Sequence, residues 1–209
     1  MSAPMHGSQM WDERYSSPEY VFGTDAAAFL TRHAHLLAPD ATALVVADGE
    51  GRNSVFLAEQ GLRVTATDIS PVGVDKARRL AAERRVEVDF RVADVLTWDW
   101  EPDAYDLVVA VFIQFLSPEQ RPGVFAGLAR TLAPGGQLLL HGYRPEQVAL
   151  GTGGPPDPSH MYTEDLLRDA FGHLEVEVLE SYEATLTEGA GHAGPSALID
   201  LVARKPAAD

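Results

Sequence analysis

The chain of 209 residues contains no cysteine. This absence excludes disulfide bonds, cysteine-ligated metals and a thiol nucleophile. Long apolar runs are also missing: no segment approaches the roughly 18 consecutive apolar residues that a membrane-spanning helix needs, and no apolar stretch typical of a secretory signal follows Met1. We therefore expect a cytoplasmic protein with no membrane partner.

Basic residues are scarce. Lys and Arg together number 16 against 31 Asp and Glu, which gives a formal net charge of −15 at pH 7. A chain of this charge repels a phosphate backbone, so we expect no nucleic-acid partner. Five histidines are scattered without the spacing of metal ligands, and no metal site is predicted. They are His6, His33, His35, His173 and His192.

Short branched-apolar runs alternate with longer segments of helical periodicity, which is typical of a parallel sheet with crossover helices. The expected strands are Ala43–Ala47, Val64–Thr67, Val86–Val92, Tyr105–Phe112 and Gln137–Tyr143. The expected helices are Asp25–Leu37, Arg52–Gln60, Pro71–Arg85, Pro118–Leu132 and Thr163–Phe171. Two further runs, Leu174–Leu186 and Ser196–Arg204, predict a closing hairpin. The fold class is α/β and doubly wound, in a single domain over residues 11–206 after a flexible tail over residues 1–10.

The sharpest local feature is Asp48-Gly49-Glu50-Gly51-Arg52-Asn53, which follows the apolar run Leu44–Ala47. Two glycines let the backbone approach a ligand closely, and a helix that begins just beyond them directs N–H groups at an anion. A tight turn that binds nothing is the alternative. Ser54 stands where a dinucleotide fingerprint has Gly or Ala, so a smaller anion such as a carboxylate is favoured over a pyrophosphate.

Two carboxylates follow the next two strands. Asp68 is placed to accept hydrogen bonds from both hydroxyls of a ribose, or alternatively to cap the helix that opens near Pro71. Asp94 is placed to accept the exocyclic amine of adenine while Val95 packs on the ring, or alternatively to occupy a surface turn. Since ligands of open α/β sheets bind at the carboxyl ends of the strands, the register of these residues with the glycine turn favours a shared site.

These segments resemble class I S-adenosylmethionine-dependent methyltransferases over nearly the whole chain, from Trp11 to Lys205. The residues that carry the resemblance are Asp48–Asn53, Thr67–Ser70, Ala93-Asp94, Tyr105–Val108 and Leu132–Gly136. Within the class, Trp11–Tyr15 and Gly49–Asn53 are similar to the small tellurite-resistance and thiopurine methyltransferase-like group.

The resemblance implies a Rossmann-like sheet of seven strands, mostly parallel with an antiparallel last strand at Ser196–Arg204. It implies S-adenosyl-L-methionine as cofactor and S-adenosyl-L-homocysteine as product, with the methionine carboxylate at the glycine turn. The implied cofactor-binding residues are Asp48, Gly49, Glu50, Gly51, Asn53, Asp68, Ile69, Asp94, Val95 and Phe112.

The chain departs from the family at one place. Members usually carry an acidic residue within the first strand and a small residue or Cys before the first glycine, whereas this chain has Val45 and Asp48. Either Asp48 takes over the contact with the amino group of the cofactor, or the departure weakens cofactor binding.

Methyl transfer from a sulfonium needs alignment and a dry pocket, and sometimes a base. Aromatic residues expected above the strand ends suit a sulfonium and an apolar acceptor, although Trp11 and Phe22 alternatively pin the first helix to the core. The expected substrate-pocket residues are Trp11, Tyr15, Tyr20, Phe22, Gln114, Tyr143, Arg144 and Tyr162. His141 and His160 are the candidate general bases, or else structural hydrogen-bonding groups. The run Gly151–Pro156 is expected to form a lid or rim.

The predicted function is in-line methyl transfer to a small-molecule acceptor by a monomer or homodimer. One alternative is a methyltransferase-fold protein that binds the cofactor as a sensor or interaction module without methylating anything. Another is a nucleotide-sugar or dinucleotide enzyme, against which Ser54 and Pro134-Gly135-Gly136 argue.

Overall fold

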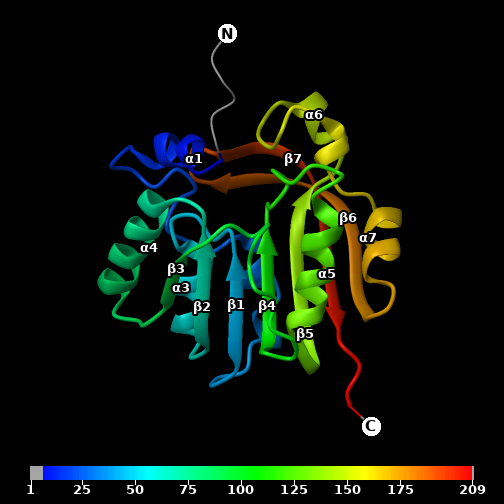
Figure 1. Ribbon diagram of the computed structural model, residues 1–209. Coiled ribbons are helices and arrows are strands. Elements are labelled where there is room, and N and C mark those ends of the chain that lie inside the picture. Colours follow the sequence, from blue (N-terminus) through cyan, green and yellow to red (C-terminus); the bar gives the residue numbers. More distant parts are fainter. Residues whose placement is uncertain (1–6, 209) are drawn as a thin grey trace.

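The computed structural model describes residues 7–208, which form one sheet of seven strands in the order β3-β2-β1-β4-β5-β7-β6 (Figure 1). The strands are β1 (Thr42–Val46), β2 (Arg63–Asp68), β3 (Asp89–Val92), β4 (Tyr105–Val111), β5 (Leu132–Tyr143), β6 (Glu175–Glu188) and β7 (His192–Arg204). Neighbouring strands from β3 to β5 pair in parallel, whereas β7 runs antiparallel to both β5 and β6. The predicted α/β sheet with an antiparallel last strand is confirmed.

Helices cover both faces of the sheet. They are α1 (Gly7–Tyr15), α2 (Ala28–Arg32), α3 (Arg52–Glu59), α4 (Pro71–Arg84), α5 (Arg121–Thr131), α6 (Gln147–Leu150) and α7 (Glu164–Phe171), with 3₁₀ turns at Ala34–Leu36 and Pro158–His160. Apolar residues of α5 and α7 join one core layer and those of α2 and α3 join the other. The strands β1, β2, β4 and β5 all point toward the end of the sheet where α1 and α6 lie (Figure 1).

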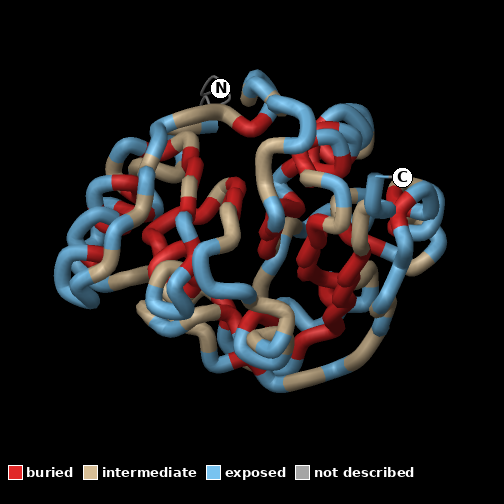
Figure 2. The backbone as a smooth tube through the Cα atoms, turned by 90° about the horizontal axis from the view of Figure 1, so that it is seen from below, coloured by how far each residue is buried: buried red, intermediate tan, exposed pale blue. Residues whose placement is uncertain are grey.

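Alternation along the central strands explains the two layers. Leu44 and Val46 of β1 pack in the layer under α5 and α7, while Ala43 and Val45 pack in the layer under α2 and α3. Successive side chains of a strand point to opposite faces, so a strand buried on both sides is apolar throughout. Buried stretches accordingly gather in the interior and exposed stretches run along the outside (Figure 2).

The N-terminal part differs most from expectation. Helix α1 begins at Gly7, inside the expected flexible tail, whereas residues 1–6 lie outside the described part of the chain. The buried ring of Tyr15 anchors α1, and a single buried residue gives no apolar periodicity to read in the sequence. The helix expected over Asp25–Leu37 is a short α2 followed by a 3₁₀ turn, because His33 leaves the helical conformation at φ −99° and ψ 14°.

Two strands also begin at residues other than those expected. β3 begins at Asp89 rather than Val86, because the N–H of Val86 still bonds to the carbonyl of Ala81 and closes α4. β5 begins at Leu132 rather than Gln137, since Leu132 pairs with Tyr105 before the register shifts. Within residues 7–208, no helix has the length and apolar character needed to cross a bilayer.

Candidate active site at the strand ends

The backbone turns sharply between the end of β1 and the start of α3. Gly49 and Gly51 have positive φ angles of 64° and 95°. A Cβ on Gly51 would lie 2.7 Å from the Cβ of Ala77, and a Cβ on Gly49 would lie 2.8 Å from the Oη of Tyr15. Glycine is therefore required at both positions, and the packing of α4 and α1 fixes the path of the turn.

Asp48 opens this turn and is 9% exposed. Its Oδ1 accepts a hydrogen bond from the N–H of Ser54 at 3.3 Å, and its Oδ2 accepts one from the Ser54 hydroxyl. Burial raises the pKa of the carboxyl to about 6, although the two bonds from Ser54 act in the opposite direction. Because a buried carboxylate is costly without a counterion, this position favours a cationic group on a ligand.

Asp68 ends β2 beside the same turn. Its Oδ2 accepts a hydrogen bond from the N–H of Gly49 at 2.8 Å and its Oδ1 accepts one from the N–H of Ser70 at 2.9 Å. Burial raises the pKa of Asp68 to about 6, partly offset by these backbone bonds. Ser70, not Asp68, caps α4, through a bond from the N–H of Gly73 to the Ser70 hydroxyl at 3.0 Å.

The third carboxylate and two apolar neighbours complete this end of the sheet. Asp94 follows β3 and is half-buried, and its Oδ1 accepts a hydrogen bond from the N–H of Leu96 at 2.9 Å. Val95 is buried directly after it. Phe112 follows β4 with a positive φ of 55°, an uncommon conformation for a bulky residue. Such conformations gather at functional sites.

A cavity of about 730 Å³ joins these strand ends. It contains fourteen of the residues predicted from the sequence: Trp11, Tyr15, Phe22, Asp48, Gly49, Asn53, Asp68, Ile69, Asp94, Val95, Phe112, Gln114, Tyr143 and His160. Within residues 7–208, Asp48, Asp68 and Asp94 form no ion pair with a Lys, Arg or His. The same residues hold no cluster of three or more His, Asp or Glu side chains arranged for a metal ion.

Three residues expected near the ligand support the turn from outside the cavity. Glu50 forms a buried ion pair with Lys76 and accepts a hydrogen bond from the N–H of Val21 at 2.7 Å. Gly51 faces α4, as described above. The hydroxyl of Tyr20 donates to the carbonyl oxygen of Lys76 at 3.2 Å. These placements correct the expectation that Glu50, Gly51 and Tyr20 contact a ligand.

Arg144 and Tyr162 also lie outside the cavity. Arg144 forms an ion pair with Glu146 at 2.9 Å. Tyr162 is fully buried in the main core, with its ring centroid 5.6 Å from that of Phe125. The 3₁₀ turn at Pro158–His160 directs the chain into the core at this point, which the sequence pattern did not indicate.

His141 is 1% exposed and lies beneath the cavity wall. Its Nδ1 lies 2.6 Å from Oδ1 of the buried Asp200, and its ring stacks on Phe29 with centroids 5.0 Å apart. The structure thus corrects the placement of His141 among the residues that meet a substrate. His160 does line the cavity, with Nδ1 3.1 Å from the carbonyl oxygen of Gln114.

Sequence reasoning missed several cavity residues. Arg14 lies within a quoted motif, and its guanidinium sits 5.3 Å from the Trp11 ring centroid and 5.0 Å from that of Phe22. Arg52 lies within another motif and pairs with Glu188 at 2.8 Å. His192 reaches the cavity from the start of β7, and no local sequence signal places a hairpin end beside the glycine turn.

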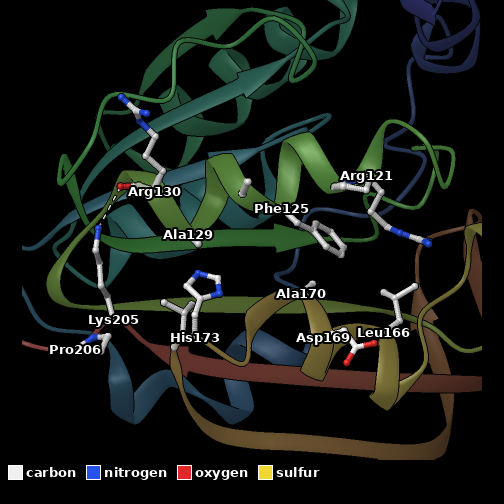
Figure 3. Close-up of a pocket in the computed structure, with 13 residues that line it drawn as sticks. Arg121, Phe125, Ala129, Arg130, Leu166, Asp169, Ala170, His173, Lys205 and Pro206 are labelled. Atoms are coloured by element: carbon white, nitrogen blue, oxygen red, sulfur yellow. Dashed lines mark hydrogen bonds between the residues drawn. The ribbon is translucent and has the colours of Figure 1, made fainter.

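A second cavity, of about 900 Å³, lies between α5 and α7. Phe125, Ala129, Leu166 and Ala170 supply apolar surface there, and the ring of His173 points toward α5 (Figure 3). None of the fourteen predicted residues lines it. The strand-end cavity is therefore the candidate active site.

Comparison with known proteins agrees with this location. Residues 43–136, which include most of β1, the glycine turn and Asp94, match the family described as "Methyltransferase domain". Cypemycin N-terminal methyltransferase from Streptomyces sp is 32% identical over 121 residues, which cover 56% of this chain and 47% of that protein. The chain spans about half the length of the curated relatives it matches.

Solved structures share the fold over most of the chain. TehB from Haemophilus influenzae superposes with a TM-score of 0.69 at 17% identity, covering 95% of this chain and 66% of TehB. The N-methyltransferase NodS from Bradyrhizobium japonicum WM9, in complex with S-adenosyl-L-homocysteine, superposes with a TM-score of 0.70 at 18% identity, covering 95% of this chain and 98% of NodS.

The glycine turn, the carboxylates at successive strand ends, the matched domain and the shared sheet agree with one another. Residues 43–136 thus match a methyltransferase domain, and residues 7–208 share the fold of solved methyltransferase structures.

Proposed function

We propose that the chain transfers a methyl group from S-adenosyl-L-methionine to a small-molecule acceptor. The observation that carries the proposal is the pair of buried carboxylates, Asp48 and Asp68, which line the cavity without a cationic partner among residues 7–208. S-adenosylmethionine brings a positively charged α-amino group, which compensates the charge of the Asp48 carboxylate, and ribose hydroxyls, which donate hydrogen bonds to Asp68.

The cofactor is proposed to lie along the strand ends in the order of the chain. Asp48 meets the amino group, and the Gly49 backbone with the Arg14 guanidinium meets the methionine carboxylate. Both oxygens of Asp68 already accept one backbone bond each, and a carboxylate has lone pairs to spare for ribose hydroxyls. Asp94 and Val95 then face the adenine. The SAH-bound NodS structure supports this placement because its fold is the same.

Catalysis in this proposal is mainly alignment. The lone pair of the acceptor atom forms the new bond to the methyl carbon while the electrons of the C–S bond remain on sulfur, and S-adenosylhomocysteine leaves. Correct alignment alone is worth roughly 7–11 kcal/mol. Trp11, Tyr15 and Phe22 surround the acceptor end with aromatic surface and exclude water. His160 remains the candidate base.

The remaining expectations are part of the same proposal. A net charge of −15 supports a small molecule as acceptor and argues against a nucleic acid. We propose that the protein works in the cytoplasm as a monomer or homodimer, without a membrane partner.

Two calorimetric titrations test the cofactor site. S-adenosylhomocysteine is expected to bind the wild type more tightly than NAD does. Asp68→Asn removes the charge at the centre of the site and should lower the affinity for S-adenosylhomocysteine at least tenfold. The matched control Asp75→Asn alters an exposed aspartate of α4 and should leave binding unchanged. Tighter binding of NAD would contradict the proposal.

Transfer of label from S-adenosyl-[methyl-³H]methionine to a panel of hydroxyl, thiol, amine and oxyanion acceptors tests the reaction. Product that depends on Asp68 supports the enzyme. S-adenosylhomocysteine binding without product from any acceptor would favour the alternative of a cofactor-binding sensor.

A further inference from the structure

Two residues that line the cavity each carry a buried polar atom without a hydrogen-bond partner among residues 7–208: Nδ1 of His192 and Oη of Tyr143. His192 is 8% exposed and Tyr143 is 1% exposed. Leaving a buried donor or acceptor unsatisfied costs about 1–3 kcal/mol, and most buried polar groups of native proteins have a partner. A ligand that bonds to these atoms would remove the cost.

The two side chains belong to one aromatic cluster at the acceptor end. The ring centroid of Phe112 lies 4.1 Å from that of His192 and 4.6 Å from that of Tyr143. The His192 and Tyr143 centroids are 5.8 Å apart and their planes are nearly perpendicular. Phe22 closes the cluster at 4.5 Å from His192. The surface around both polar atoms therefore suits a flat apolar body.

Both groups are neutral at physiological pH. Burial, together with the nearby charges of Arg52 and Arg14, lowers the pKa of His192 to about 2. Burial raises the pKa of the Tyr143 phenol well above its usual value. A neutral imidazole keeps one ring nitrogen as an acceptor, and a neutral phenol keeps its proton as a donor.

The segment Gly151–Pro156, here called the glycine rim, passes directly over Tyr143. A Cβ on Gly153 would lie 2.7 Å from Oη of Tyr143, and a Cβ on Gly154 would lie 2.9 Å from its Cδ2. The hydroxyl of Thr152 ties this rim to the carbonyl oxygen of Pro195 on β7. The rim thus covers the phenol and belongs to the same part of the cavity as His192.

We propose that His192 and Tyr143 are specificity-determining residues that select a planar, neutral acceptor carrying a hydroxyl group. The proposal rests on the proposed function and names its substrate class. A hydroxyl donates to the free imidazole nitrogen and accepts from the phenol at the same time. A carboxylate or other oxyanion has no proton to donate, an alkylammonium has no lone pair to accept, and an ether cannot donate.

The methyl transfer balances with this arrangement. The hydroxyl oxygen forms the bond to the methyl carbon, sulfur keeps the electrons of the broken C–S bond, and the hydroxyl proton is released to solvent. His192 and Tyr143 position the hydroxyl and do not act as the base.

Calorimetry on the protein saturated with S-adenosylhomocysteine tests the proposal, with 2-naphthol, 2-methoxynaphthalene and 2-naphthoate as probes. The wild type should bind 2-naphthol about tenfold more tightly than either of the others, which matches one or two neutral hydrogen bonds. Tyr143→Phe and His192→Leu should each remove most of that preference. S-adenosylhomocysteine affinity of both variants should stay at the wild-type value.

Tyr162→Phe is the matched control, since Tyr162 is also a buried tyrosine with an unpartnered hydroxyl but lies outside the cavity. It should keep the full preference for 2-naphthol. A wild type that prefers the ether or the carboxylate, that binds none of the three, or whose preference survives in both Tyr143→Phe and His192→Leu, overturns the inference. Loss of S-adenosylhomocysteine binding in the wild type would instead overturn the proposed function, so the two failures are distinguishable.

Discussion

The buried ion pair between Glu50 and Lys76 offers a direct test of how the glycine turn is held. Both side chains are 2% exposed. The Lys76 ammonium also donates to the carbonyl oxygens of Ser17 at 2.9 Å and Glu19 at 2.6 Å. Because Glu50 bonds to the N–H of Val21, the pair ties the segment that follows α1 to the turn and to α4.

We predict that Glu50→Gln destabilises the fold by about 3 kcal/mol. The amide keeps the shape of the side chain and an acceptor for Val21, but it leaves the Lys76 ammonium buried without a counterion. Breaking a buried pair from one side costs about 3–5 kcal/mol, and the carbonyl bonds that remain on Lys76 keep the loss near the lower end. The variant should also bind S-adenosylhomocysteine more weakly, since the segment beside the turn is loosened.

Urea unfolding measures the effect. With a slope of about 2–3 kcal/mol per M, the midpoint should fall by roughly 1 M or more. The control Asp75→Asn breaks an exposed pair with Arg78 on the same helix, which should cost at most about 0.5–1 kcal/mol. The double variant Glu50→Gln/Lys76→Met buries no charge and should recover most of the loss. Equal effects of Glu50→Gln and Asp75→Asn would refute this reasoning.

Three further predictions follow from the site. Gly51→Ala should lower the free energy of unfolding in urea by at least about 2 kcal/mol, because the new Cβ meets Ala77 and the φ angle of Gly51 is positive. The control Gly123→Ala lies in α5 with open space around it and should raise the free energy of unfolding by about 0.5–1 kcal/mol. Equal effects of the two substitutions would contradict the steric argument. Burial raises the pKa of Asp48 and Asp68 to about 6. Both groups gain protons as the pH falls through that value, so calorimetric affinity for S-adenosylhomocysteine should weaken below pH 6. The free energy of unfolding without ligand should instead decrease as the pH rises from about 4 to 6, since the folded state there holds protons that the unfolded state has released. His141→Asn should lower the unfolding free energy by about 1–3 kcal/mol, because Asp200 loses a buried partner, yet leave S-adenosylhomocysteine affinity unchanged; a selective loss of affinity would return His141 to the site.

The sequence correctly predicted that residues at or just after the ends of the parallel strands lie together. Asp48, Gly49, Asp68 and Asp94 all line the cavity because the carboxyl ends of parallel strands share one edge. Glu50 sits between two of them in the chain and was expected to behave alike. Its side chain instead turns toward α4, because the positive φ angles of the flanking glycines reverse the backbone around it.

The acceptor end was harder to predict because long-range pairing builds it. Tyr162 and His141 were expected to line the cavity. Instead Tyr162 packs against Phe125 and His141 packs against Phe29, so both lie in the core. His192 enters the cavity only because the hairpin of β6 and β7 is long enough to reach the segment that contains Phe22. The register of a hairpin depends on side-chain packing along its full length, which a single sequence does not reveal.

The ion pair between Arg52 and Glu188 joins the beginning of the sheet to its last hairpin. During synthesis on the ribosome, the strands that carry the glycine turn emerge early, whereas the hairpin that carries His192 emerges among the last residues. A nascent chain halted before Glu188 would therefore possess the carboxylates and most aromatic residues of the cavity, but it would lack His192 and strand β7. Shortening the protein from its carboxyl end removes the part of β7 that pairs with β5 before it reaches His192, so the sheet should fail before acceptor recognition is lost selectively.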